Sequence, residues 1–559
     1  MKLPGRNPAD LLLELDLTRH VLEDPPVSPL DRLTARRTTT VRDLVEALEK
    51  AAGDDRVVGV IAHVGTRQPT LAQSTELRDA IDTVRRAGKA TVCWSESYGP
   101  ELGPGNIAYH LASAFEEVWL VPTGGLGLLG VSASAVFLRD ALDKVGVQPQ
   151  ISQRREYKTA ANIFLQTGLT EAHREMLTAL AESATSVIVS DIATDRELSE
   201  VDVRAAIEAA PLSAQQAHER RLVDRLGYRE EVYAALRQRL GDVERSFLER
   251  YARTADRVRA GASLLRRHRP VVGVVQASGP IHLGHSRRRT PLAGSTTGSD
   301  SVGAALRAAA RDDNVKTVVL RVDSPGGSYV ASDVIRREVR AVRDVGKPVV
   351  VSMASVAASG GYFVSMAADN IVAAPGTLTG SIGVLAGKQV IRDALSRAGI
   401  GRQSVSSAPH AQMFSSERPF NEDEWSRLED WLDRVYEDFT TKAAQDRAMP
   451  LDKLLDAARG RVWTGADAVR LGLVDQLGGL STAIDLACGR AGIQRERARV
   501  LALPRISPLE RLIPPRNSDS PTAASSMLDP QGSLLEHALA LAGLSPHGAL
   551  TMPLYVTLR

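Results

Sequence analysis

The sequence predicts an α/β protein of two similar domains in tandem, each built on a largely parallel sheet. First, 559 residues are too many for one ordinary domain. Second, long stretches of the chain occur twice, at a spacing far longer than the period of a solenoid repeat. Third, apolar strand-like runs alternate with helical segments in each copy, which is typical of βαβ units on a parallel sheet.

The duplication is clearest where each domain begins its sheet. DDRVVGVIAHV starts at Asp54 and DDNVKTVVLRV starts at Asp312, so the two copies are offset by 312 − 54 = 258 residues. In each copy a helical segment follows, at 74–88 or at 332–346, and then a second apolar run. We therefore interpret the two halves as copies of one domain.

Composition and the repeat together set the expected domain limits. We expect an N-terminal domain over 1–240, a charged helical connector over 241–269 and a C-terminal domain over 270–500. The remaining residues, 501–559, are expected to form a tail with a polar linker, a short amphipathic helix and a final edge strand. We expect this tail to cover the protein or to contact another copy.

Charge and cysteine content exclude several classes of function. A formal charge of +2 gives no electrostatic reason to expect a nucleic-acid partner. Two cysteines cannot build a disulfide framework or a metal cluster, and neither a metal nor a cofactor is expected. No signal peptide or membrane-spanning stretch is expected, so we expect a cytoplasmic chain or one that contacts a membrane peripherally.

The second copy contains a candidate nucleophile. SVAASGGYFVSMAAD places Ser359 in a turn of small residues between a strand and a helix, followed by Gly360 and Gly361. Taken alone, the same turn would also suit a serine that caps a helix. In the first copy, 253 residues earlier, the equivalent residue is Asn106. Only the second copy therefore retains a nucleophile here.

The first copy contains a candidate base. QRREYKTAANIF includes Lys158, whose second-copy equivalent is Ala411. Burial in an apolar site lowers the pKa of a lysine, and a neutral amine can take the proton of a serine hydroxyl. Each copy has lost the group that the other keeps. This pattern predicts a Ser–Lys dyad, Ser359 with Lys158, that forms across the domain boundary.

A serine nucleophile also requires backbone N–H donors for the oxyanion. Gly360 can supply one, and the SPGG turn can supply another through Gly326 or Gly327, which the sequence does not distinguish. Ser381, in LTGSIGV, offers a hydroxyl that could orient the lysine. Its first-copy equivalent is Leu128, so this serine too occurs only beside the nucleophile.

Four segments, RVDSPGG, AASGGYFVSMAAD, LTGSIGV and REYKTA, resemble the motifs of the signal peptide peptidase A (protease IV) family. The resemblance extends from about residue 10 to about residue 490. It implies two tandem ClpP/crotonase-like domains and a serine endopeptidase with Ser359 as nucleophile and Lys158 as general base. It also implies Ser381 as the hydrogen-bonding partner of the lysine, and Gly360 with an SPGG glycine as the oxyanion hole.

The same resemblance implies substrates and assembly. The expected substrates are remnant signal peptides and other hydrophobic peptide segments, and a ring-like homo-oligomer, a tetramer, is expected. Two alternatives remain open at this stage. One is a crotonase-type acyl-CoA hydratase or hydrolase, although such enzymes normally use acidic side chains and lack the SGGY turn. The other is a non-catalytic, membrane-associated scaffold, which the intact second-copy motifs disfavour.

Overall fold

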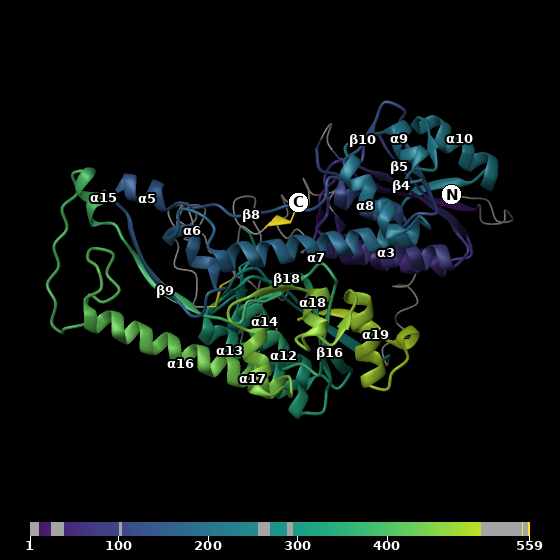
Figure 1. Ribbon diagram of the computed structural model, residues 1–559. Coiled ribbons are helices and arrows are strands. Elements are labelled where there is room, and N and C mark those ends of the chain that lie inside the picture. Colours follow the sequence, from purple (N-terminus) through teal and green to yellow (C-terminus); the bar gives the residue numbers. More distant parts are fainter. Residues whose placement is uncertain are drawn as a thin grey trace.

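Two parallel sheets, one in each half of the chain, organise the structure (Figure 1). The computed structural model describes residues 10–23, 39–99, 103–254, 269–287, 294–504, 550–551 and 557–558. In Figure 1 the first half, in purple to blue, lies above the second half, in teal to yellow-green. The long helix α7 (Glu171–Asp195) runs along the contact between the two.

The first sheet has the strand order β11-β6-β5-β4-β1-β12, and every neighbouring pair is parallel. Its central strands are apolar because helices cover both faces. The strands are β1 (Leu11–Leu17), β4 (Val57–Val64), β5 (Ala90–Ser95), β6 (Glu117–Leu120), β11 (Arg225–Leu226) and β12 (Glu244–Phe247). The helices around them are α2 (Val41–Ala52), α3 (Leu71–Arg86), α4 (Asn106–Ser113), α8 (Glu200–Ala209), α9 (Ala214–Glu219) and α10 (Arg229–Leu240).

The second sheet repeats this order. Its strands β24-β13-β16-β18-β19-β23 correspond to β12-β1-β4-β5-β6-β11, and a branch adds β20 and β22 beside β18. The strands are β13 (Val271–Ser278), β16 (Val315–Ser324), β18 (Val349–Ala358), β19 (Asn370–Ala373), β20 (Leu378–Gly380), β22 (Val462–Thr464), β23 (Gln476–Leu477) and β24 (Arg499–Leu503). The helices are α12 (Ser299–Arg311), α13 (Tyr329–Asp344), α14 (Gly360–Ser365), α16 (Glu422–Asp446), α17 (Leu451–Ala457), α18 (Gly465–Arg470) and α19 (Leu480–Arg490). The predicted duplication is therefore visible in the topology.

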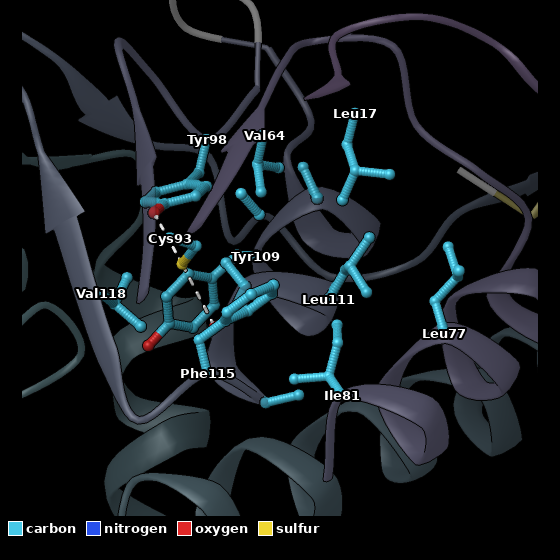
Figure 2. Packing of buried hydrophobic residues seen from close by; sticks show 14 of the residues in the cluster. Leu17, Val64, Leu77, Ile81, Cys93, Tyr98, Tyr109, Leu111, Phe115 and Val118 are labelled. Atoms are coloured by element: carbon cyan, nitrogen blue, oxygen red, sulfur yellow. Dashed lines mark hydrogen bonds between the residues drawn. The ribbon is translucent and has the colours of Figure 1, made fainter. Parts of the chain in front are cut away.

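Each half has its own hydrophobic core between its sheet and its helices. Figure 2 shows the first: Leu77 and Ile81 of α3 face Leu111 and Phe115, and Tyr98 lies over Cys93. The Tyr98 hydroxyl also donates to the Trp119 carbonyl, so this buried phenol is satisfied.

The two halves are interleaved rather than merely adjacent. Strand β9 (Gln148–Gln153) of the first half pairs antiparallel with β21 (Leu385–Val390) of the second. This ribbon, with α5 (Arg139–Val145) and α15 (Arg392–Arg397) at its end, extends away from the body at the left of Figure 1. A buried ion pair adds a second tie: Arg321 of β16 donates to Glu76 of α3 at 2.6 Å.

Helix α7 is the one described helix that is long and apolar enough to cross a membrane by length and composition. The sequence reading did not identify it. Here α7 packs against α4 in the first half and against β22 in the second. It therefore serves as a connection between the two domains.

The structure corrects the expected connector. Residues 244–247 form β12, an edge strand of the first sheet, and not a helix, whereas residues 248–254 are helical as expected. Charged residues are frequent on edge strands, so ERSF has the composition of a charged helix although it forms a strand. Residues 255–268 of the connector lie outside the described residues, as do the polar linker and the amphipathic helix expected in the tail. The second sheet extends to Leu503, slightly beyond the expected limit at residue 500.

Two short pieces of the tail are described, and both are strands. Leu550–Thr551 (β25) pairs antiparallel with Gly326–Gly327 (β17) of the second half. Thr557–Leu558 (β26), the expected edge strand, pairs antiparallel with Ala133–Ser134 (β8) of the first half. The remaining short elements are β2 (Val21–Leu22), β3 (Thr39–Thr40), β7 (Gly125–Leu126), β10 (Leu212–Ser213), β14 (Ile281–His282), β15 (Thr297–Gly298), α6 (Asn162–Leu165) and the 3-10 turns η1 (Thr159–Ala161) and η3 (Arg495–Arg497).

Candidate active site

Ser359 occupies a strained turn between β18 and α14. Its φ is +55° and its ψ is −112°, a conformation that residues with a side chain seldom adopt. The backbone holds it there: Ser359 N–H donates to the Gly380 carbonyl at 2.8 Å, and Phe363 N–H donates to the Ser359 carbonyl at 2.9 Å. The side chain is wholly buried.

The glycines after Ser359 are required by close approach of the backbone. A Cβ on Gly360 would lie 2.8 Å from Ser332 Oγ and 3.0 Å from Gly327 N. A Cβ on Gly361 would lie 2.5 Å from the Ser324 carbonyl oxygen. Both positions therefore exclude any larger residue, and the turn brings the SPGG segment against the nucleophile.

Lys158 comes from the first half and reaches this turn. It lies between β9 and η1, and its Nζ is 2.7 Å from Ser359 Oγ. The same Nζ is 3.1 Å from both the hydroxyl and the carbonyl oxygen of Ser381. The structure thus brings together the side chains of Lys158, Ser359 and Ser381, as the sequence predicted. Lys158 and Ser359 are 201 residues apart in the chain.

Electrostatics favour the neutral form of this lysine. Lys158 is wholly buried, and burial alone lowers its pKa well below the ordinary value. Its three hydrogen-bonding partners within the described chain are uncharged oxygens, so no carboxylate there stabilises an ammonium. An amine in this setting is suited to accept a proton.

Ser381 is held as firmly as Ser359. It follows β20 with φ of +51°, is fully buried, and donates its N–H to the Arg461 carbonyl at 2.6 Å. Both its hydroxyl and its carbonyl oxygen point at the lysine Nζ. Sequence reasoning identified the hydroxyl but not the carbonyl, because nothing in the residue type indicates where a backbone oxygen will point.

The two SPGG glycines differ in their hydrogen bonds. Gly326 N–H donates to Ser324 Oγ at 3.1 Å and is therefore engaged inside the turn. Gly327 N is the amide that lies beside Gly360, as the 3.0 Å approach above indicates. Gly327 also tolerates no side chain, since a Cβ there would lie 2.1 Å from the Ile281 carbonyl oxygen.

The first half shows what replaced the nucleophile. Asn106, the equivalent of Ser359, donates its amide to the Gly130 carbonyl at 2.8 Å and accepts from Gly130 N–H at 3.0 Å. The side chain therefore closes the position with two structural hydrogen bonds. Nothing at this point of the first half resembles an active site.

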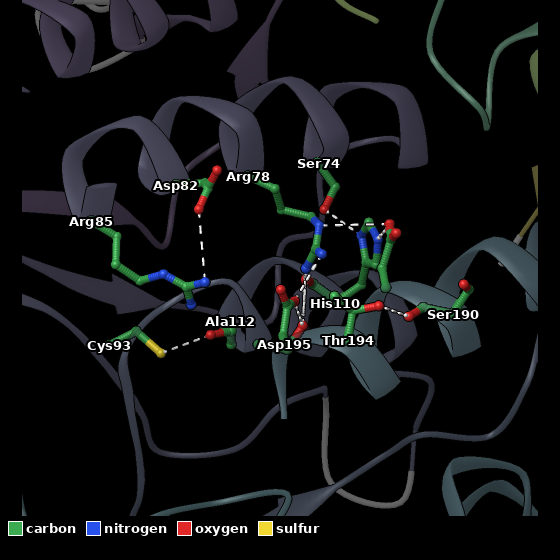
Figure 3. Close-up of polar contacts among 12 residues, drawn as sticks. Ser74, Arg78, Asp82, Arg85, Cys93, His110, Ala112, Ser190, Thr194 and Asp195 are labelled. Carbon is green, nitrogen blue, oxygen red and sulfur yellow. Dashed lines mark hydrogen bonds and ion pairs between the residues drawn. The ribbon is translucent and has the colours of Figure 1, made fainter. Parts of the chain in front are cut away.

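A second polar cluster lies inside the first half and has the residue types of a Ser–His–Asp triad. Ser74 Oγ is 2.8 Å from His110 Nδ1, and His110 Nε2 is 2.8 Å from Asp191 Oδ2. Figure 3 shows Ser74, Arg78, His110 and Asp195 converging between the helices. Ser74 and His110 are both fully buried, and their hydrogen bonds join α3, α4 and α7. Ser74 lies within the regular backbone of helix α3, whereas Ser359 lies on a strained turn beside the Gly327 amide.

Among the described residues, no group of three His, Cys, Asp or Glu side chains is placed to hold a metal ion. Sequence reasoning missed one segment that contacts the site, Arg459–Gly460–Arg461. Tyr157 N–H donates to the Arg459 carbonyl, and Gly460 N–H donates to the Ile382 carbonyl. A signal was present in the duplication, because the equivalent first-copy residues carry no glycine.

The chain is similar to known proteins over most of its length. The sequence profile described as "Peptidase family S49" matches residues 100–244 and 341–494. "Serine protease SPPA, chloroplastic" of Arabidopsis thaliana is 32% identical over 475 residues, covering 83% of this chain and 68% of that protein. "Protease 4" of Salmonella typhi is 30% identical, covering 81% and 72%. "Protease 4" of Haemophilus influenzae is 29% identical, covering 81% and 73%.

Proposed function

This chain belongs to peptidase family S49, and on that premise we propose that it is a Ser–Lys endopeptidase with Ser359 as nucleophile and Lys158 as general base. The resemblance found in the sequence is confirmed by this membership, and so is the class of enzyme, a serine peptidase. The predicted fold class is confirmed as well, since the profile matches once in each half and the halves share one strand order.

The observation that carries the assignment is the 2.7 Å contact between Lys158 Nζ and Ser359 Oγ in a fully buried site. A neutral amine has two N–H bonds and one lone pair. If the two N–H groups are directed at the hydroxyl and carbonyl oxygens of Ser381, the lone pair faces the Ser359 hydroxyl. Ser381 then orients the lysine for proton transfer.

The reaction follows from this arrangement. As Ser359 Oγ attacks the peptide carbonyl carbon, its proton moves to Lys158 Nζ. The ammonium then gives that proton to the leaving amine as the peptide C–N bond breaks, which leaves an acyl group on Ser359. The neutral lysine next takes a proton from water as the water oxygen attacks the acyl carbon. The bond from the acyl carbon to Ser359 Oγ then breaks, and the lysine ammonium returns the proton to Ser359 Oγ, which releases the acid product and restores the neutral lysine.

The negative oxygen of each tetrahedral intermediate needs two N–H donors. We assign these to Gly360 and Gly327, whose backbones approach each other closely. Gly326 is the weaker candidate because its N–H already donates to Ser324 Oγ. This choice refines the sequence expectation, which left both SPGG glycines open.

The strand edge beside the oxyanion glycines is suited to bind a peptide in extended form. Gly326–Gly327 pairs antiparallel with Leu550–Thr551 of the same chain, so this edge accepts an extended peptide. We propose that substrates bind there in the same way, in place of Leu550–Thr551. The relatives' class and the sequence resemblance favour hydrophobic segments such as remnant signal peptides, reached by peripheral contact with a membrane.

Assembly with further copies is part of the proposal. The arm formed by β9 and β21 carries apolar side chains that are exposed at its end: Val145 (54%), Ile400 (52%) and Phe414 (66%). Apolar side chains gathered on a projecting arm favour burial against another protein surface. A homo-oligomer, with a tetramer as the specific expectation, would bury them.

The two alternatives considered from the sequence are not favoured. A crotonase-type acyl-CoA enzyme would not need a lysine held against a serine, and a non-catalytic scaffold would not need the strained turn at Ser359. Peptidase family membership disfavours both.

The test compares single variants on a fluorogenic peptide. Ser359→Ala and Lys158→Ala are each expected to lower kcat/KM by at least 10³-fold without loss of cooperative unfolding. Lys347→Ala is the matched control: burial also lowers its pKa, but it precedes the opposite end of the strand that leads to Ser359. Near-normal hydrolysis by Lys158→Ala would disprove the dyad.

A further inference from the structure

Three residues between α17 and β22 contact both the segment that carries Lys158 and the turn that carries Ser381. We call Arg459–Gly460–Arg461 the clamp. Its Arg459 carbonyl accepts from Tyr157 N–H at 3.2 Å, on the segment that carries Lys158. Its Arg461 carbonyl accepts from Ser381 N–H at 2.6 Å, on the turn that receives the lysine Nζ. The clamp therefore joins the base of one half to the serine turn of the other.

Gly460 is the point of closest approach to Lys158. Its φ is +78°, and a Cβ built there would lie 2.5 Å from Lys158 N, 2.6 Å from its Cβ and 2.7 Å from its Cα. Real Cβ atoms do not approach so closely, so any side chain at 460 would displace the lysine backbone. A second glycine, Gly383, lies against the side-chain stem, with a built Cβ 3.1 Å from Lys158 Cδ.

The side chains of the clamp hold the neighbour of the lysine. The Arg461 guanidinium donates to both carboxylate oxygens of Glu175, each at 2.7 Å, and lies 4.9 Å from the centre of the Tyr157 ring. The Arg459 guanidinium lies 5.4 Å from the same ring. Contacts of this kind restrict Tyr157, which directly precedes Lys158 in the chain.

The duplication shows that the clamp accompanies the lysine. Thr464 and Ser213 are equivalent, since each caps the helix after the corresponding short strand, α18 or α9. At that offset of 251 residues the first-copy counterparts of the clamp are Glu208, Ala209 and Ala210. The first copy therefore has Ala209 where the second has Gly460. The residue that corresponds to Lys158 in the second copy is Ala411, so the first-copy counterpart of the clamp has no lysine to hold.

We propose that the clamp is a positioning element for the general base, with Gly460 as the surface that fixes the backbone of Lys158. This inference rests on the proposed dyad. Within the described residues, the clamp contacts the backbone and stem of the lysine segment and the Ser381 turn, and not Lys158 Nζ or Ser359 Oγ. It acts through Lys158, whose Nζ must stay within hydrogen-bonding distance of Ser359 Oγ, and a displacement of about 1 Å in such a group can lower a rate by about 10²-fold.

The primary test is Gly460→Ala measured against Gly346→Ala. Both glycines have a left-handed φ, +78° and +80°, but the space around a Cβ on Gly346 is empty to 4 Å. Backbone strain is therefore similar in the two variants, and only Gly460→Ala displaces Lys158. We expect Gly460→Ala to lower kcat/KM by about 10²-fold, and Gly346→Ala to change it less than twofold.

A readout specific to the base separates positioning from general destabilisation. The rate at which a fluorophosphonate probe labels Ser359 is measured against pH. In the wild type this rate is expected to rise with pH as Lys158 becomes neutral, at a pH below the ordinary pKa of lysine. In Gly460→Ala that rise is expected to be lost or moved upward, whereas Gly346→Ala should keep it.

A double-mutant cycle completes the design. In the Lys158→Ala background, Gly460→Ala should lower the labelling rate no further, because the group that it positions is absent. Additive effects, or a pH profile in Gly460→Ala equal to that of Gly346→Ala, would overturn the proposal. If Gly460→Ala does not unfold cooperatively, Arg461→Gln replaces it, with an expected loss of about tenfold and the same upward movement of the pH profile.

The outcome is distinguishable from a failure of the proposed function. If the probe does not label wild-type Ser359, or if Lys158→Ala retains activity, the dyad itself is wrong. If the dyad variants behave as expected and Gly460→Ala matches its control, only the clamp is wrong.

Discussion

Lys158 is a buried amine whose hydrogen-bonding partners, among the residues that the structure describes, are uncharged oxygens. Such a site is unfavourable for the charged form, and burial lowers the pKa of Lys158 well below its usual value. The unfolded chain, by contrast, holds its lysines protonated at neutral pH. Folding therefore weakens the binding of a proton by this group, and the property that suits it to act as a base also reduces the stability of the protein.

This linkage gives a signed prediction for Lys158→Met, which keeps a long side chain without a titrating group. Between the lowered pKa and about 10.5 the unfolded wild type binds one more proton than the folded wild type, so wild-type stability rises with pH across that window. The variant lacks this dependence. It is expected to be inactive yet more stable at pH 7, by ~1 kcal/mol or more.

Urea unfolding of both proteins at several pH values measures this. The advantage of Lys158→Met should shrink as the pH is raised toward 10.5. An advantage that is absent at pH 7, or that grows with pH, would show that the lysine is buried in its charged form.

The duplication allowed the two dyad residues to be predicted from the sequence, because each copy had lost what the other kept: Asn106 stands for Ser359, and Ala411 stands for Lys158. Gly460 also differs between the copies, since its equivalent is Ala209, but that difference does not show what Gly460 contacts. Its role depends on a contact with the backbone of a residue about 300 positions away, and composition carries no record of such a contact.

Among the elements, α3 connects the interior of the first half to the strand that ends at Ser359. Its capping residue, Thr70, has its hydroxyl 2.7 Å from that of Ser355 on β18. One turn later, Ser74 contacts His110. Burial, and next the Arg78 guanidinium, lower the pKa of His110 to about 4, so the ring is neutral near pH 7. Its Nδ1 then accepts from Ser74, and its Nε2–H donates to Asp191.

This buried histidine predicts sensitivity to acid. The unfolded chain takes up a proton near pH 6.5, whereas the folded protein resists protonation of His110 until about pH 4. The contribution of this ring to stability is therefore complete above pH 6.5 and is lost as the pH falls toward 4, an effect of about 3 kcal/mol. His110→Gln is expected to be less stable at pH 7 and to lose less stability on acidification.

The measurement is the difference in unfolding free energy between wild type and His110→Gln at pH 7 and at pH 4.5. Taking the difference between the two proteins removes the titration of the carboxyl groups that they share. An equal loss of stability in both would show that His110 does not control the acid response.

The elements themselves were predictable to different degrees. The apolar strands β4 and β16 and the helices that follow them were evident from pattern, because burial on both faces imposes a nearly continuous apolar run. The ribbon of β9 with β21 was not, since its partners belong to different copies and pair only once the halves are docked. The prediction of a helix over Glu244–Phe247 is wrong because an exposed edge strand such as β12 can have the composition of a charged helix.

At the scale of the whole molecule, the two halves meet in one continuous structure. Arg321 of the second half is buried between Glu76 and Glu23 of the first, at 2.6 Å and 2.7 Å. The β9–β21 ribbon and α7 make further ties. The dyad lies at this contact, and Lys158 meets the Ser359 of its own chain.

That last point predicts the result of a mixing experiment. Lys158→Ala and Ser359→Ala chains are co-expressed, so that any oligomer contains both. Because each dyad forms within one chain, no subunit in the mixture has both groups, and hydrolysis should stay at the level of either variant alone. Wild type co-expressed with Ser359→Ala is the control and should retain activity in proportion to its share. Recovery of substantial activity in the mixture would show that lysines pair with serines of other subunits.

The division of the site between the halves also has a consequence for synthesis. The ribosome delivers Lys158 first, Ser359 about 200 residues later, and Gly460 about 100 residues after that. On the proposed assignment, a chain that is still growing holds the base without the nucleophile, and then the nucleophile without the segment that completes its surroundings. We therefore expect chains that end before Gly460 to be inactive, so that hydrolysis begins only when most of the protein has been made.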